Sequence, residues 1–127
     1  MSKRMICSLV AILVLILPMS GVSAAEMLPE GVTIVVLKES PVSHLPGIVK
    51  VKYMELRLAP GTKWMNYTIS TSGFCTALQG AITVEVGDKT ITHFAGESWV
   101  MKKGHTVNMY NRGTVEHVQR VWLLVEG

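Results

Sequence analysis

Short runs of alternating apolar and polar residues, separated by glycine, fill the chain from Pro60 to Asn111. In the clearest run, Ile82, Val84 and Val86 alternate with other residues, as in a strand with one buried face. The glycines between the runs are Gly61, Gly80, Gly87, Gly96 and Gly104. Short β-favouring segments with glycine at this spacing predict antiparallel strands that close on one another.

The same pattern extends over most of the chain after residue 31. The predicted strands are residues 32–37, 49–58, 64–70, 76–79, 81–86, 89–94, 98–101, 106–110 and 118–125. Residues 38–47 contain Pro41, Pro46 and Gly47, so we expect a loop there. No apolar stripe with a helical period persists after residue 24, so we expect no helix of useful length in that part.

Two of the predicted strands carry further information. In residues 49–58 the apolar positions change parity at Tyr53 and Met54, which predicts a bulge or a change of sheet face. Residues 121–125 are apolar at both parities. This predicts a strand that is buried on both faces, either in the centre of a sheet or against a partner.

The first 24 residues have the organisation of a signal peptide. Lys3 and Arg4 precede an apolar stretch over residues 5–19, and the small residues at 22–24 suit a signal peptidase. We expect cleavage after Ala24, with Ala25 as the alternative, and one domain over residues 25–127. An uncleaved anchor is the other interpretation, but the stretch is short for a span of roughly 20 residues. The mature chain is therefore expected to be periplasmic or extracellular, with no membrane contact.

Composition narrows the class of protein. Of the 127 residues, 49% are hydrophobic and 17% charged, which excludes a disordered chain and allows a real core. The net charge is +3, but without Lys3 and Arg4 the mature chain has 10 basic residues against 9 acidic ones. No basic cluster remains to hold phosphates, so we expect no nucleic-acid partner.

Cysteine use is sparse. Cys7 leaves with the signal peptide, and the mature chain keeps only Cys75, which therefore has no partner for an internal disulfide. A lone cysteine in an exported protein is a buried small hydrophobe, an intermolecular bridge or a reactive thiol. We favour burial.

Glycine and asparagine residues in two segments follow the spacing of the cupin motifs, G-x5-H-x-H-x(3,4)-E-x6-G and G-x5-P-x-G-x2-H-x3-N. The first segment runs from Gly61 to Gly80, and the second from Gly96 through Gly104 to Asn111. The chain thus resembles the cupin superfamily over about residues 45–125. The resemblance implies an all-β, single-domain barrel of the double-stranded β-helix or jelly-roll type.

The residues that hold the metal ion in cupins are replaced. The positions of the two His, the Glu and the later His are taken by Tyr67, Ile69, Gly73 (or Phe74) and Val107. Imidazole and carboxylate groups are the ligands that a divalent transition metal needs, and a phenol, two aliphatic chains and a glycine do not substitute for them. We therefore expect no metal and no other cofactor.

The four histidines lie elsewhere. We expect His44 and His117 in loops, His93 as a satisfied strand residue, and His105 in the turn beside Gly104. A non-standard metal site built from His93 and His105 is the alternative.

No other catalytic set stands out. The serines have no accompanying His-Asp pattern, and no glycine-rich phosphate loop opens a helix. Cys75 and His105 would form a reactive pair only if both faced the barrel interior, which their spacing does not show.

The resemblance also indicates which residues face the interior. If the strands that carry the metal-ligating positions of cupins face inward here, the candidate residues for binding a small molecule are Tyr67, Ile69, Cys75, Val107 and Met109. They would form an apolar pocket with one phenol, and the alternative is that they fill the interior as core.

Four further residues receive structural roles. We expect Asn111 to tie the backbone of a turn. The tryptophans Trp64, Trp99 and Trp122 are expected in the core or at an interface, with no ligand role.

Two hypotheses for function follow. The favoured one is an exported, non-catalytic cupin-like module that binds a small apolar or mixed ligand or serves as an accessory subunit. The alternative is a metal-dependent oxygenase, isomerase or lyase that acts on a small polar substrate through non-standard His ligands. The resemblance and the edge strands also predict a homodimer, or docking onto a larger exported protein.

Overall fold

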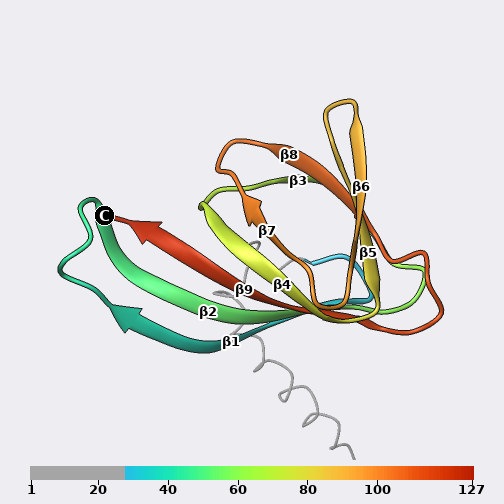
Figure 1. The fold of residues 1–127 in the computed structure, drawn as a ribbon, viewed down its shortest axis with the longest axis horizontal. Helices are drawn as coiled ribbons and strands as arrows, with labels where there is room; N and C mark the ends of the chain where they lie inside the picture. The colour runs from blue at the N-terminus through green and yellow to red at the C-terminus, as the bar shows by residue number, and fades with distance from the viewer. Residues whose placement is uncertain (1–27) are drawn as a thin grey trace, which may run out of the picture.

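The computed structural model describes residues 28–127, and the predicted signal peptide and Cys7 lie outside them. The described residues form nine strands in two antiparallel sheets, as the all-β prediction requires (Figure 1). The strands are β1 (Val32–Pro41), β2 (Ile48–Leu58), β3 (Lys63–Thr68), β4 (Gly73–Gln79), β5 (Ala81–Val86), β6 (Lys89–Phe94), β7 (Ser98–Met101), β8 (Thr106–Tyr110) and β9 (His117–Glu126). Within this part of the chain, no helix is long and apolar enough to cross a membrane.

The two sheets differ in size. The larger has the strand order β1-β2-β9-β4-β7, and the smaller has the order β3-β8-β5-β6. The last strand, β9, pairs with β2 on one side and β4 on the other. Its central place in the sheet agrees with the prediction, but residues 122–125 are only half-buried, so burial on both faces is not found in the single chain. Beyond the barrel, β1, β2 and the end of β9 extend together as an arm (Figure 1).

The core lies between the sheets and is built from cross-strand rows. In the larger sheet, Met54 of β2 pairs with Val121, Val121 pairs with Cys75, and Cys75 pairs with Trp99. In the smaller sheet, Val84 pairs with Met109. Directly opposite residues share a face, so these rows point toward each other across the interior.

The first strand corrects two predictions. Residues 38–41 continue β1 rather than forming a loop, because Pro41 lies at the end of an edge strand, where its missing N–H costs no ladder hydrogen bond. The irregularity expected at Tyr53 and Met54 is instead in the neighbouring strand. The register of β1 shifts between Val36 and Lys38, opposite Met54 and Tyr53.

A second bulge shapes the smaller sheet. The register between β3 and β8 shifts between Trp64 and Tyr67, and Asn66 takes a positive φ of 55° there. The Asn66 backbone N–H donates to Asn108 Oδ1 at 2.7 Å, which holds the bulge against β8. The bulge brings Trp64 and Tyr67 together, with ring centroids 4.5 Å apart. Without the bulge, residues three apart would lie on opposite faces of the strand, and with it Trp64 and Tyr67 lie on the same face.

The turn after β8 is tied as predicted. Asn111 is almost fully buried, and its Nδ2 donates to the carbonyl oxygens of Leu58 and Val115, each at 2.9 Å. Its Oδ1 accepts from the Gly113 N–H at 3.0 Å. The side chain therefore joins the end of β2 to the loop that precedes β9.

The outer face of the larger sheet carries an aromatic row. Trp122 lies between Tyr53 and Phe74, with ring centroids 4.8 Å and 5.0 Å away. Beside this row, Arg120 donates to Glu55 Oε1 at 2.9 Å and to the Tyr53 hydroxyl. Trp122 is thus on the outside of the barrel.

Candidate ligand-binding cavity

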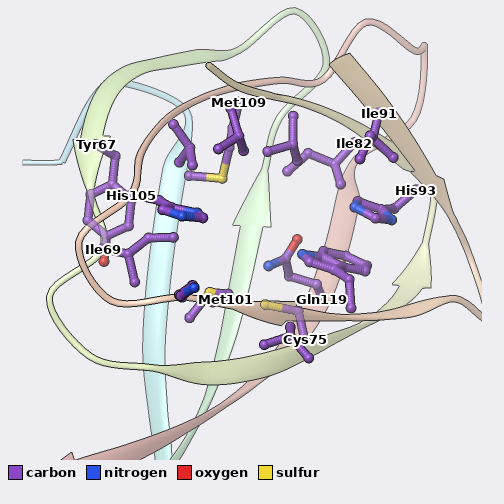
Figure 2. Close-up of a pocket in the computed structure, with 16 residues that line it drawn as sticks. Tyr67, Ile69, Cys75, Ile82, Ile91, His93, Met101, His105, Met109 and Gln119 are labelled. Carbon is purple, nitrogen blue, oxygen red and sulfur yellow. The ribbon is translucent and has the colours of Figure 1, made fainter. Parts of the chain in front are cut away.

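A cavity of about 180 Å³ lies between the two sheets. Its wall comes from strands of both sheets and from the turn between β7 and β8 (Figure 2). The sixteen lining residues are Tyr67, Ile69, Cys75, Ile82, Val84, Val86, Ile91, His93, Trp99, Val100, Met101, Lys102, His105, Val107, Met109 and Gln119. The interior is therefore not completely filled by side chains.

The structure brings the five predicted site residues to this one cavity. Tyr67 and Ile69 come from β3 and its end, Cys75 from β4, and Val107 and Met109 from β8. All except Tyr67 are buried. Their role in ligand binding remains a prediction. The cavity is more polar than the expected apolar pocket, because Gln119, two histidines and Lys102 also line it.

The position expected for the cupin carboxylate has no room for one. A Cβ atom added to Gly73 would lie 1.9 Å from the Trp122 carbonyl oxygen. Phe74 stacks on Trp122, on the outer face of the sheet. On β4 the side chain that faces the cavity is Cys75 (Figure 2).

The floor of the cavity is a buried polar chain. Gln119 is 3% exposed, and its Oε1 lies 2.7 Å from Nε2 of His117, which is fully buried. The second ring nitrogen of His117 is buried without a hydrogen bond of standard geometry. This overturns the expectation that His117 is a loop residue. Burial is the main cause that lowers its pKa, although the hydrogen bond with Gln119 opposes the change.

Cys75 is buried as predicted, with no exposed surface. Burial raises the pKa of its thiol to about 12, and the hydrogen bond with Gln119 only partly opposes this. The thiol therefore stays protonated at neutral pH, and it does not form a thiolate pair with His105. Burial likewise raises the pKa of the Tyr67 phenol, which keeps its proton.

One wall of the cavity is a stacked aromatic pair. The rings of His93 and Trp99 lie 3.8 Å apart between centroids and are inclined by 5°. Burial is the main cause that lowers the pKa of His93, and nearby Glu97 opposes the shift. Neutral His93 thus presents a flat ring system to the cavity. Trp99, for which we expected no ligand role, is part of the wall.

The rim is the turn between β7 and β8. Lys102 and His105 are exposed and also line the cavity. The turn is fastened to the end of β3, because the Ile69 N–H donates to the His105 carbonyl and the Gly104 N–H donates to the Ile69 carbonyl, each at 2.8 Å. His105 is therefore a turn residue, as expected, and also part of the cavity.

A metal ion does not fit the residues around the cavity. Among residues 28–127 no three His, Cys, Asp or Glu side chains are grouped so that they could hold one. His93 and His105 line the cavity, but His93 stacks on Trp99 and its Nδ1 lies 3.8 Å from Glu97 Oε1. The positions of three cupin ligands are Tyr67, Ile69 and Val107.

Comparison with solved structures settles the fold. A cupin superfamily protein from Desulfitobacterium hafniense DCB-2 superposes with a TM-score of 0.57 at 11% identity, over 77% of this chain and 81% of that one. A cupin 2 conserved barrel domain protein from Salinispora arenicola CNS-205 gives 0.57 at 15% identity, over 76% and 78%. The protein has the cupin fold.

The cupin domain of Schizosaccharomyces pombe Cnp3 gives a TM-score of 0.60 at 14% identity, over 79% of this chain and 69% of that one. No protein-family model and no curated protein matches the sequence. The cupin fold is thus shared at low sequence identity, which leaves the role of the cavity to be argued from its own residues.

Several cavity residues were not predicted. Gln119, Trp99, Met101 and Lys102 lie outside the ligand positions of the motifs, so the spacing of the motifs does not single them out. Strand parity alone finds one of them. Gln119 lies two residues before Val121 on β9, so it shares the inward face of that strand.

Proposed function

We propose that this protein is an exported, non-catalytic cupin-fold module that binds a small ligand in its barrel. One observation carries the proposal, which is a cavity of about 180 Å³ whose wall combines apolar side chains with a few polar ones. Such a wall is typical of sites that hold an apolar body and orient it by a few hydrogen bonds. Export rests on the signal peptide predicted for residues 1–24.

The states of three reactive side chains in the wall support a non-catalytic role. The thiol of Cys75 and the phenol of Tyr67 are held in their protonated forms by burial. His93 is stacked on Trp99 and is neutral at neutral pH. The wall therefore offers neither an activated nucleophile nor a set of three metal ligands among the described residues.

Native mass spectrometry of the mature protein purified from its own source tests the proposal. We expect a retained small molecule, and Val86→Phe should lose it, because this half-buried side chain lines the cavity and would fill it. Val115→Phe is the matched control, since Val115 is 53% exposed and lies in a loop. Equal retention by both variants would contradict binding in the barrel.

The metal-dependent alternative is tested on the same preparations. Metal analysis should give no stoichiometric transition metal. A stoichiometric ion that is lost in both His93→Ala and His105→Ala would favour the enzyme hypothesis instead.

We also propose that two copies pair through β1. This strand is at the edge of its sheet in the described structure, and three consecutive side chains on it, Val35, Val36 and Leu37, are 45%, 47% and 44% exposed. An edge strand of ten residues offers unpaired backbone groups to a second copy, and a two-fold axis brings like strands together antiparallel. Docking onto a larger exported protein would instead leave the purified chain monomeric.

A further inference from the structure

The wall of the cavity contains a lysine and no carboxylate. None of the sixteen lining residues is Asp or Glu, whereas Lys102, His93 and His105 are among them. Glu97 accepts from the Phe94 N–H at 2.9 Å, and its Oε1 lies 3.8 Å from Nδ1 of His93, but Glu97 does not line the cavity. A cationic ligand would therefore meet Lys102 without a compensating carboxylate in the wall.

Several side chains of the wall carry hydrogen-bond donors. Lys102 has only donors, and Tyr67, kept protonated, has a hydroxyl proton to donate. Gln119 has its oxygen occupied by His117, which leaves its NH₂ group facing the thiol of Cys75. A ligand that matches this wall must supply acceptor atoms.

The basic rim is held in place before any ligand arrives. Besides the bonds to Ile69, the Lys103 N–H donates to Ser72 Oγ at 3.1 Å, and the His105 N–H donates to the Lys102 carbonyl at 3.2 Å. Lys103, in contrast, is turned to Glu126, with Nζ 2.7 Å from Oε1. The two adjacent lysines therefore differ in their contacts. Lys102 lines the cavity, and Lys103 forms an ion pair with Glu126 of β9.

The volume limits the size of the ligand. Engineered cavities of about 150 Å³ hold one benzene molecule. A cavity of about 180 Å³ therefore accepts one ring, or a chain of similar volume, with a small head group at the exposed rim.

We infer that the ligand is a small organic anion, whose single ring or short chain lies against the His93–Trp99 stack and whose carboxylate lies at Lys102 and His105. This inference rests on the proposed function, since it names the chemistry of the molecule that the barrel holds. It goes beyond that function because the apolar part of the wall alone would accept a neutral ring equally well.

Calorimetric titration of the mature protein at neutral pH with three ring compounds of one shape tests it. Benzoate should bind about tenfold or more tightly than neutral benzamide, and benzamidinium should not bind, as expected for one charge-assisted hydrogen bond. Equal affinity for benzoate and benzamide, or tighter binding of benzamidinium, would overturn the anion inference and leave the proposed function standing. If none of the three compounds binds, both the anion inference and the proposed binding of a single-ring ligand in the barrel are overturned.

Two variants locate the carboxylate. Lys102→Met should weaken benzoate binding by about tenfold and leave benzamide binding unchanged, because it removes only the charged donor. Lys103→Met is the matched control, since its side chain is committed to Glu126 and should not alter either affinity. Equal losses for both variants would mean that the basic rim acts only as a diffuse charge, which would overturn the assignment to Lys102.

Discussion

The Nε2 atom of His117 lies 2.7 Å from Oε1 of Gln119, on the same face of β9 and beneath the cavity floor. A fully buried imidazole thereby fixes the amide that faces Cys75. Because burial lowers its pKa, His117 remains neutral in the folded protein at pH values where the unfolded chain is already protonated.

We therefore predict that acid destabilises the protein and that His117 accounts for part of the loss. The unfolded state binds a proton below about pH 6.5 and the folded state does so only at lower pH, so stability falls as the pH decreases through this value. Melting curves should show a smaller difference between about pH 7.5 and about pH 5 for His117→Gln, which cannot titrate. His93 contributes in the same direction and remains in that variant.

His44→Gln is the control for this measurement, because His44 is exposed in the loop between β1 and β2. Its acid sensitivity should equal that of the unchanged protein. If His117→Gln also retained the full sensitivity, the neutral state of His117 would be wrong.

Substitution of Gly73 should strongly lower the free energy of unfolding. Gly73→Ala should destabilise the fold by about 3 kcal/mol or more, since the new Cβ would overlap the Trp122 carbonyl oxygen and the backbone would have to move. Gly113→Ala should change the free energy of unfolding by less than about 1 kcal/mol, because the nearest atom would be Asn111 Oδ1 at 3.5 Å. Denaturant titration compares the two, and equal costs would contradict the close approach of β4 and β9.

Asn111 should be difficult to replace. Asn111→Ala removes three hydrogen bonds and leaves two carbonyl oxygens and one N–H without this partner, so we expect a loss of about 2–4 kcal/mol. Asn108→Ala should cost about 1 kcal/mol or less, because Asn108 is only half-buried and its bonds to Asn66 and Glu85 lie near the solvent. Thermal unfolding monitored by circular dichroism provides the comparison. A loss below that of Asn108→Ala would show that the side chain does not hold the turn.

The thiol of Cys75 should be inert in the folded protein. Its pKa of about 12 leaves almost no thiolate at neutral or mildly alkaline pH, and the side chain has no exposed surface. Mass spectrometry after iodoacetamide treatment should find Cys75 unmodified in buffer and fully modified in denaturant. Rapid modification in buffer would mean that the barrel opens readily.

Pairing through β1 gives a prediction about assembly. Sedimentation of the mature chain at tens of micromolar should show a dimer, and Val35→Lys should shift it to a monomer by placing a charge in the strand that pairs. The monomer tolerates this change, because Val35 lies opposite Glu55 of β2. Leu45→Lys, in the exposed loop after β1, should leave the dimer intact. A monomer for the unchanged chain would contradict the pairing.

Much of the fold could be predicted, because local sequence determines it. Residues 81–86, 89–94, 98–101 and 106–110 form strands with the predicted bounds, since each is a short β-favouring run ended by a turn or by glycine. Predictions failed where the neighbouring strand determines the end of a strand or the position of a bulge. Pro41 ends a strand because it lies on an edge, and the bulge is opposite Tyr53 rather than at it.

The site was predictable only in part, for a related reason. Tyr67, Ile69 and Val107 were found because the motif spacing marks their positions. His117 was expected in a loop, but it pairs with Leu58 of a strand distant in sequence and is buried by that pairing. His93 and Trp99 stack although they belong to different sheets, and no local pattern reports such a contact.

The distribution of the three tryptophans gives the protein its own optical reporters. Trp99 is on the cavity wall, Trp64 packs against the core beside Tyr67, and Trp122 is outside on the larger sheet. Indole emission from Trp99 should therefore respond to cargo in the barrel, while emission from Trp122 should respond to whatever covers the outer face. Single-tryptophan variants would allow the two events to be followed separately in one fluorimeter cell, without any attached dye.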